Sequence, residues 1–211
     1  MKIIALLMAI AFVSACSDET YVVLNTATLP TDHYRVIDEP RDAVWETSVP
    51  KLDKQFFTVD FLDKKSGVIN ISYSGDPEKF VDCGHVTSRV RDAKGEHSYD
   101  FPAAKGQAAY EIMNGDVLFH IDRKMSVVAR ASLVFKETNP NQTQVSVNTL
   151  YTLQKDVTAR RADNDFTQSW SDSISFGSQG STPFGNDINS ATTTVCVANG
   201  EFEREILATI K

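Results

Sequence analysis

The stretch Asp82-Cys83-Gly84-His85 is where residue types and spacing first suggest chemistry in this 211-residue sequence. A cysteine two residues from a histidine could pair a nucleophile with its base, or supply two ligands of a zinc site. Zinc needs three or four ligands, and the other histidines do not lie at ligand spacing: His33, His97 and His120. Because Cys196 offers a partner, we expect a Cys83–Cys196 disulfide, which an oxidising compartment favours.

Other chemical patterns are weak. The chain has no G-x-S-x-G, no glycine-rich phosphate loop with lysine, no H-E-x-x-H and no paired C-x-x-C. The oxygens of Asp163-Asn164-Asp165 suit Ca²⁺, but the glycine and distal glutamate of a calcium loop are missing, so an acidic turn is expected. Three acids beside a helix start are expected to complement its dipole and face solvent rather than catalyse: Glu201, Glu203 and Glu205. We therefore predict a protein without catalytic residues, metal or cofactor.

The first residues have the pattern of a secretory signal. Lys2 is followed by an uncharged apolar run over residues 3–13, which is shorter than the roughly 20 residues that a transmembrane helix needs. The run ends in Val13-Ser14-Ala15-Cys16, which resembles the lipobox of bacterial lipoproteins. That resemblance implies removal of residues 1–15, a diacylglycerol thioether on Cys16 and acylation, for example with palmitate, of its new amino terminus. Ser17, in place of aspartate, resembles the class sorted to the outer membrane.

Lipidation on Cys16 would fix the protein to a bilayer, since each buried CH₂ contributes about 0.8 kcal/mol and two or three chains act together. The expected location is therefore the periplasmic side of the bacterial outer membrane. The net charge of −7 is a poor match for nucleic acid, so none is expected as a partner. Behind the signal we expect a lipidated N-terminus and tether over 16–32, with at most one attached strand, and a single periplasm-facing domain over 33–211.

The start of that domain predicts a strand, a helix and a hairpin. Residues 34–37 have strand character, and Asp38-Glu39-Pro40 marks a helix start. Pro50 either kinks this helix or begins a second one. Strands over 57–61 and 68–73 flank a turn in which Gly67 is free to take a positive φ.

The second half alternates apolar and polar residues, as strands with one wet face do. Alternation covers 117–125, 127–135 and 145–157, with the rows broken by Arg123 and Lys155. Further strands are expected over 166–176 and 194–198, a flexible loop over 177–194 and a helix over 201–210. The predicted class is α+β: mainly antiparallel sheet with an N-terminal helix in a strand–helix–hairpin unit and a short C-terminal helix.

Residues 34–75 resemble the repeated domain of the BamC/NlpB lipoproteins, through Val44-Trp45, Lys65-Ser66-Gly67 and Tyr73. The resemblance implies an accessory role in the outer-membrane β-barrel assembly machinery and no catalytic residues. The element order also resembles the helix-grip folds of START-like lipid-binding proteins, which implies an apolar cavity.

Two functions follow as expectations. The first is a non-enzymatic accessory or scaffold lipoprotein of the cell envelope that binds other envelope proteins. The alternative is a binder or carrier of a hydrophobic small molecule in a sheet-and-helix cavity. Trp45 lies on the apolar stripe of its helix and is expected in the core. Trp170, among serine and aspartate, is the predicted contact for a partner.

Overall fold

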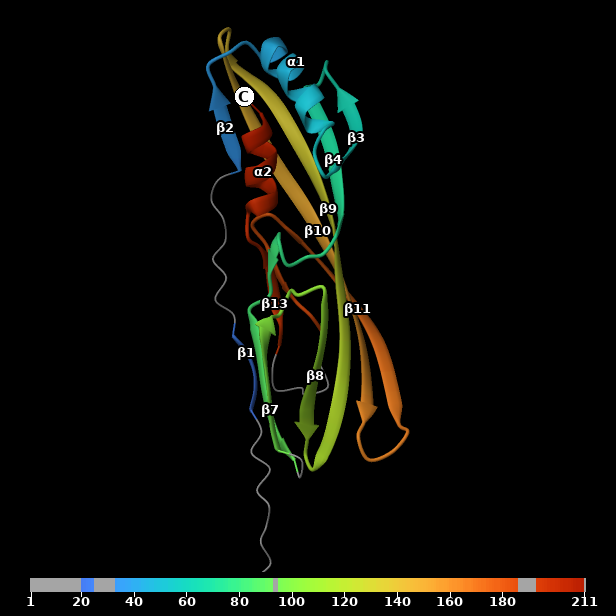
Figure 1. The fold of residues 1–211 in the computed structure, drawn as a ribbon. Helices are drawn as coiled ribbons and strands as arrows, with labels where there is room; N and C mark the ends of the chain where they lie inside the picture. The colour runs from blue at the N-terminus through green and yellow to red at the C-terminus, as the bar shows by residue number, and fades with distance from the viewer. Residues whose placement is uncertain (1–19, 25–32, 93–94, 186–192, 211) are drawn as a thin grey trace, which may run out of the picture.

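The computed structural model describes residues 20–24, 33–92, 95–185 and 193–210, which form an elongated antiparallel β structure (Figure 1). Strands make up 62% of it, and helix only 12%, in two short helices. The predicted α+β class is therefore wrong. The helices are additions to a β framework, because the chain's period-2 alternation extends much further than its helical stripes.

Two very long strands form the axis of the molecule. Strand β9 (Val117–Asn139) has 23 residues, and β10 (Gln142–Arg161) has 20 and pairs with it along almost its whole length. At about 3.3 Å per residue, β9 is up to about 75 Å long. The sequence suggested two strands on either side of Ser126, but alternation continues through that point, so one strand forms.

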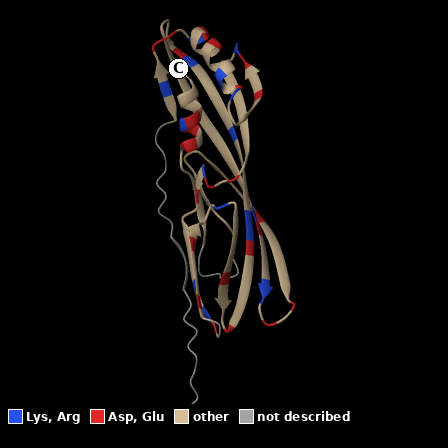
Figure 2. Cartoon of the chain, in the orientation of Figure 1, with Lys and Arg blue, Asp and Glu red and all other residues tan. Residues whose placement is uncertain are grey.

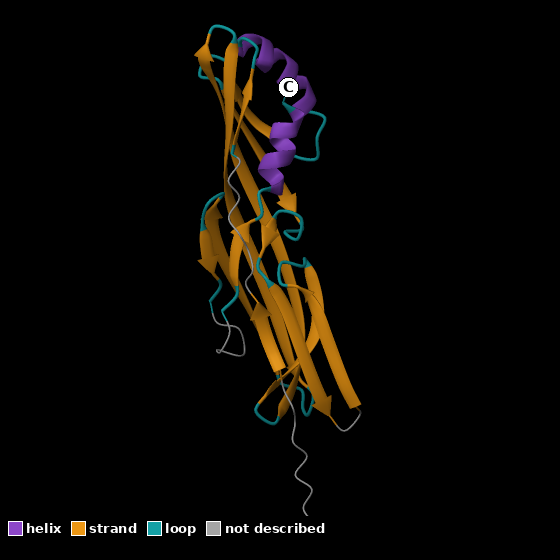
Figure 3. Cartoon of the chain, turned by 90° about the vertical axis from the view of Figure 1, so that its left-hand side faces the viewer, coloured by secondary structure: helices purple, strands orange, loops and turns teal. Residues whose placement is uncertain are grey.

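One end of the elongated molecule is covered by helices, and we call it the helix-covered half. Here β4 (Val68–Gly75) pairs with β9, β3 (Thr58–Asp63) pairs with β4, and β2 (Tyr34–Ile37) pairs with β10. Helix α1 (Arg41–Leu52) lies against β9 and β10, and helix α2 (Glu201–Thr209) lies against β10 and α1 (Figure 3). Helix α1 continues through Pro50, which settles the question that the sequence left open.

Apolar side chains fill the helix-covered half. Trp45 is only 7% exposed and meets the Phe135 ring edge-on, with ring centroids 5.2 Å apart, so its predicted place in the core is confirmed. Under α2, the Phe80 and Phe202 rings lie 5.1 Å apart, and Tyr151 lies 6.5 Å from Phe202. All three are fully buried.

The other half contains two facing sheets, and we call it the double-sheet half. Here β8 (Gln107–Asn114) and β11 (Thr167–Gly177) flank β9 and β10. The second sheet consists of β1 (Thr20–Leu24), β6 (His85–Asp92) and β7 (Gly95–Pro102). The attached strand allowed for in the tether is β1. Residues 76–116 carried no predicted element, and the structure has four strands there, including β5 (Val81–Asp82).

A third, small sheet lies between the halves (Figure 1). It joins β12 (Ser181–Pro183), β13 (Val195–Ala198) and β5. Strand β12 lies inside the segment 177–194 that was expected to be a flexible loop, and Phe184 beside it is only 3% exposed. The described part of that segment is therefore held by the core.

Candidate functional site

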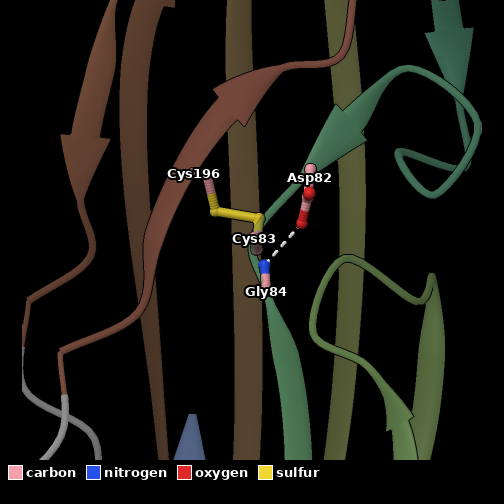
Figure 4. Close-up of a disulfide and its surroundings, with 4 residues drawn as sticks. All are labelled: Asp82, Cys83, Gly84 and Cys196. Carbon is pink, nitrogen blue, oxygen red and sulfur yellow. Dashed lines mark hydrogen bonds between the residues drawn. A yellow bond between two sulfur atoms is a disulfide. The ribbon is translucent and has the colours of Figure 1, made fainter. Parts of the chain in front are cut away.

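The first sequence candidate is a disulfide. Cys83 and Cys196 are bonded across a sequence separation of 113 residues, and both are fully buried (Figure 4). His85 points elsewhere, since its Nε2 pairs with the Asp100 carboxylate. The predicted disulfide is confirmed, and the Cys–His nucleophile that the spacing allowed is excluded.

Local geometry explains why the chain can turn into this disulfide. Gly84 has a φ of 81°, which suits glycine, and its backbone N–H donates to Asp82 Oδ1 at 2.7 Å (Figure 4). The disulfide joins the short strand β5 to β13, and so attaches the segment that precedes α2 to the middle of the fold. Its role here is structural.

The predicted lipidation residue, Cys16, lies outside the described residues. Strand β1 nevertheless begins at Thr20, and its first residue lies opposite Arg89 in β6. Arg89 lies three residues before the end of β6, where that strand turns into β7 at the free end of the double-sheet half. The chain that follows Cys16 therefore joins the fold at the end opposite to the helices.

A cluster that sequence reasoning missed lies in the double-sheet half. The Glu111 carboxylate, in β8, is 2.6 Å from His97 Nδ1 and 3.0 Å from His120 Nδ1. Glu111 is 8% exposed, and its backbone carbonyl accepts a hydrogen bond from Ser88 Oγ at 2.6 Å. Burial, followed by the hydrogen bond to Glu111, raises the pKa of the Tyr99 hydroxyl.

This cluster connects the two sheets, because His97 comes from β7 and His120 from β9, opposite Glu111. The histidines are 23 residues apart in the sequence, so spacing could not reveal them. To predict the cluster, one would have needed the β8–β9 register, which places His120 opposite Glu111. Within the described ranges no group of three His, Cys, Asp or Glu side chains is arranged to hold a metal. We interpret the cluster as a polar link between sheets.

The acidic sequence candidates have structural partners. Arg161 pairs with Asp163 at 2.6 Å, and Asn164 Oδ1 accepts from the Phe166 backbone N–H, as in a surface turn. Glu201 pairs with Arg204, and Glu205 lies 2.6 Å from Lys79 Nζ. Glu203 was expected on a solvated face. It is instead fully buried, and the hydrogen bonds that Tyr151 and Ser178 donate to its carboxylate at 2.7–3.0 Å offset the cost of that burial.

Trp170, the predicted partner contact, is only half-buried and packs against the core from β11. Its Nε1 atom is buried without a hydrogen-bond partner. The ring therefore faces the interior, and the residue's place in the fold differs from the open surface position that its polar neighbours suggested.

In the helix-covered half, an apolar groove lies on the outer face of the sheet, where side chains such as Phe61 and Leu150 point to solvent. Phe61 on β3 is 51% exposed and Leu150 on β10 is 49% exposed. Asp60, Asn70, Arg130 and Ser132 are among the polar residues that also line it. The groove has a volume of about 540 Å³.

Figure 2 shows Lys and Arg interspersed with Asp and Glu along the length of the molecule, in keeping with the modest net charge of −7. No helix in the described part of the chain is long and apolar enough to cross a membrane. No family model, no curated protein and no solved structure matches this chain.

Proposed function

We propose that this protein is a lipid-anchored, non-enzymatic accessory or scaffold protein of the bacterial envelope, working in outer-membrane assembly as the BamC-like segment suggests. One observation carries the proposal. Strand β1 starts at the free end of the double-sheet half, four residues after Cys16, while the apolar groove lies in the helix-covered half. A lipid anchor on Cys16 would therefore lie at the opposite end of the fold from the groove.

The distances follow from strand geometry. Four residues of extended chain reach at most about 14 Å, so an acylated Cys16 keeps the double-sheet half close to the bilayer. Strand β9 begins at that end with Val117 and reaches the groove at Ser132. Fifteen residues at about 3.3 Å raise the groove about 50 Å from the free end. The molecule would work as a spacer that presents a binding surface away from the lipid.

The chemistry of the groove favours an extended protein segment as its occupant. Phe61 and Leu150 offer two apolar walls, while Arg130 and Asp60 provide one charge of each sign beside them. A partner segment with apolar side chains between an acidic and a basic residue would complement this surface. Strand β3 is also the edge of its sheet, so its free backbone groups can pair with such a segment.

The alternative carrier function is less well supported at the place where it was expected. A sheet-and-helix cavity would lie beneath α2, but that space holds the Phe80, Phe202 and Tyr151 rings in mutual contact. A ligand there would have to displace a packed aromatic core.

Photocrosslinking in intact envelopes tests the proposal. A photoreactive residue in place of Phe61 should give a reproducible crosslink to one envelope protein, and Leu150→Asp should suppress it by placing a charge in the groove. The matched control is the same probe in place of Phe166, which is 50% exposed in the double-sheet half. Absence of a product from position 61, or the same product from both positions, would contradict the proposal.

A further inference from the structure

Two cations that break the apolar rows of the sequence are buried side by side. Arg123 on β9 is 4% exposed and Lys155 on β10 is 2% exposed. Arg123 lies opposite Val157, and Lys155 is two residues before Val157, so the two side chains are diagonal neighbours on one face of the sheet. This face is the interior of the double-sheet half.

The Arg123 guanidinium is not satisfied by the protein. Its Nε and Nη2 atoms are both buried and neither has a hydrogen-bond partner. One face of the guanidinium is covered by the Phe101 ring, whose centroid lies 5.3 Å from Cζ. A buried charge without an acceptor is strongly disfavoured, which makes this arrangement unusual for a residue with only a structural role.

A third unpaired donor belongs to the same cross-strand row. Val157 has Arg123 as its neighbour on β9 and Trp170 as its neighbour on β11, and the buried Trp170 Nε1 also lacks an acceptor. Three N–H donors thus lie beside Val157, two from Arg123 on β9 and one from Trp170 on β11, the strands on either side of β10. The Lys155 ammonium, which lies 4.5 Å from the Phe184 ring centroid, adds positive charge nearby.

We infer that Arg123 and Trp170 form a binding site for a carboxylate carried on an apolar body. The Nε and Nη2 atoms form one side of the guanidinium fork, and two parallel N–H donors on that side match the two oxygens of a carboxylate. The Phe101 ring packs on the guanidinium, and Val157 and Trp170 are its neighbours in the same cross-strand row, so the apolar residues beside it suit an aliphatic chain better than a free inorganic ion. The inference goes beyond the proposed function and depends on neither the anchor nor the groove.

Binding of octanoate tests the site. The full chain carrying Cys16→Ser would be used, so that no acyl chain of its own competes, with [1-¹³C]octanoate followed by its carboxylate chemical shift and by calorimetry. We expect one octanoate per chain, with binding at least tenfold weaker to Arg123→Gln. Arg123→Lys keeps the charge but loses the fork, and should also bind at least several-fold more weakly. Lys124→Gln, an exposed neighbour that loses the same charge, should bind as the parent does.

Two further ligands identify what is recognised. 1-Octanol has the same chain without the carboxylate and should bind at least tenfold more weakly, and acetate has the carboxylate without the chain. Equal binding of octanol, equal binding of acetate, no octanoate binding up to 10-fold molar excess at millimolar protein, or full binding to Arg123→Gln would each overturn the inference. If Arg123→Gln fails to fold, Arg123→Lys and the octanol comparison still decide it.

Discussion

At the scale of single residues, the polar side chains that interrupt apolar rows are the informative ones. The alternation identified Arg123 and Lys155 as exceptions, and the structure buries both. Pattern alone could not show this, because a strand can equally release an interrupting charge to solvent by twisting or ending. Glu203 was misassigned for a related reason: its three donor contacts come from residues 25 and 52 positions away, which helix periodicity does not report.

The Tyr151–Glu203 pair predicts a specific alkaline instability. Burial, and then the neighbouring Glu203 carboxylate, raise the Tyr151 pKa above its ordinary value of 10.0. Above pH 10 the unfolded chain loses this proton while the folded protein keeps it, so the free energy of unfolding falls as pH rises, by up to about 1.4 kcal/mol per pH unit.

Denaturant unfolding of wild type and Tyr151→Phe between pH 8 and 12 checks this. Tyr151→Phe should cost about 1–3 kcal/mol near pH 8, because Glu203 loses a donor, and should then lose less stability with pH than wild type does. The control is Tyr34→Phe at a residue that is 58% exposed, which should change neither value. Parallel pH profiles for wild type and Tyr151→Phe would contradict the assignment.

At the scale of elements, the turn between β3 and β4 shows what composition can predict. Gly67 was expected to take a positive φ, and it does, at 69°. The tight approach to β9 could not be predicted, since a Cβ at Gly67 would lie 2.6 Å from the Phe135 carbonyl oxygen. The first feature is local, whereas the second depends on a strand that lies almost seventy residues further along the chain.

Gly67→Ala should therefore be more destabilising than the strain of a left-handed residue alone. Gly115 is the matched comparison, with a φ of 59° and no atom within 4 Å of the position that a Cβ would take. We expect Gly115→Ala to cost about 1–2 kcal/mol from strain, and Gly67→Ala to cost more because the Phe135 backbone must also move. Thermal or denaturant unfolding of both variants measures the difference. Equal losses would show that the β9 contact is unimportant.

Strands were predictable where alternation was long and unpredictable where it was short. The rows of β9 and β10 were found, and so were the approximate positions of both helices. Strands β6–β8 were not, because polar residues at buried positions, such as Ser88 and Glu111, hide their apolar face. The predicted α+β class was wrong because the two helices make up only 12% of a fold that is 62% strand, and the unassigned strands added to an already dominant sheet.

At the scale of the whole molecule, the disulfide is the main covalent constraint. The two cysteines are 113 residues apart in the sequence, and the loop that the disulfide closes includes β9, β10 and most of the double-sheet half. Chain-entropy estimates for a loop of this length give about 4–5 kcal/mol.

The double variant Cys83→Ala/Cys196→Ala should lose stability of this order in guanidinium unfolding. Reduction of the wild type should lower the midpoint by a similar amount, and should leave the midpoint of the double variant unchanged. An unchanged midpoint on reduction of wild type would show that the crosslink contributes nothing to the folded state.

Cys16, as the proposed point of attachment to the membrane, is the residue on which the proposed function depends most. With lipid on Cys16, the double-sheet half would lie against the bilayer. The groove would then stand about 50 Å from the free end of that half, as calculated from a strand rise of about 3.3 Å per residue. Without lipid on Cys16, the distance between that residue and the groove would have no functional meaning.

Intact mass of the mature protein, combined with membrane fractionation of wild type and Cys16→Ser, tests this most directly. We predict a wild-type chain that begins at Cys16, carries the mass of a diacylglycerol and an acyl group, and sediments with outer membranes, while Cys16→Ser appears in the soluble fraction. A wild-type chain with an unmodified Cys16, or equal membrane association of the two proteins, would contradict the account.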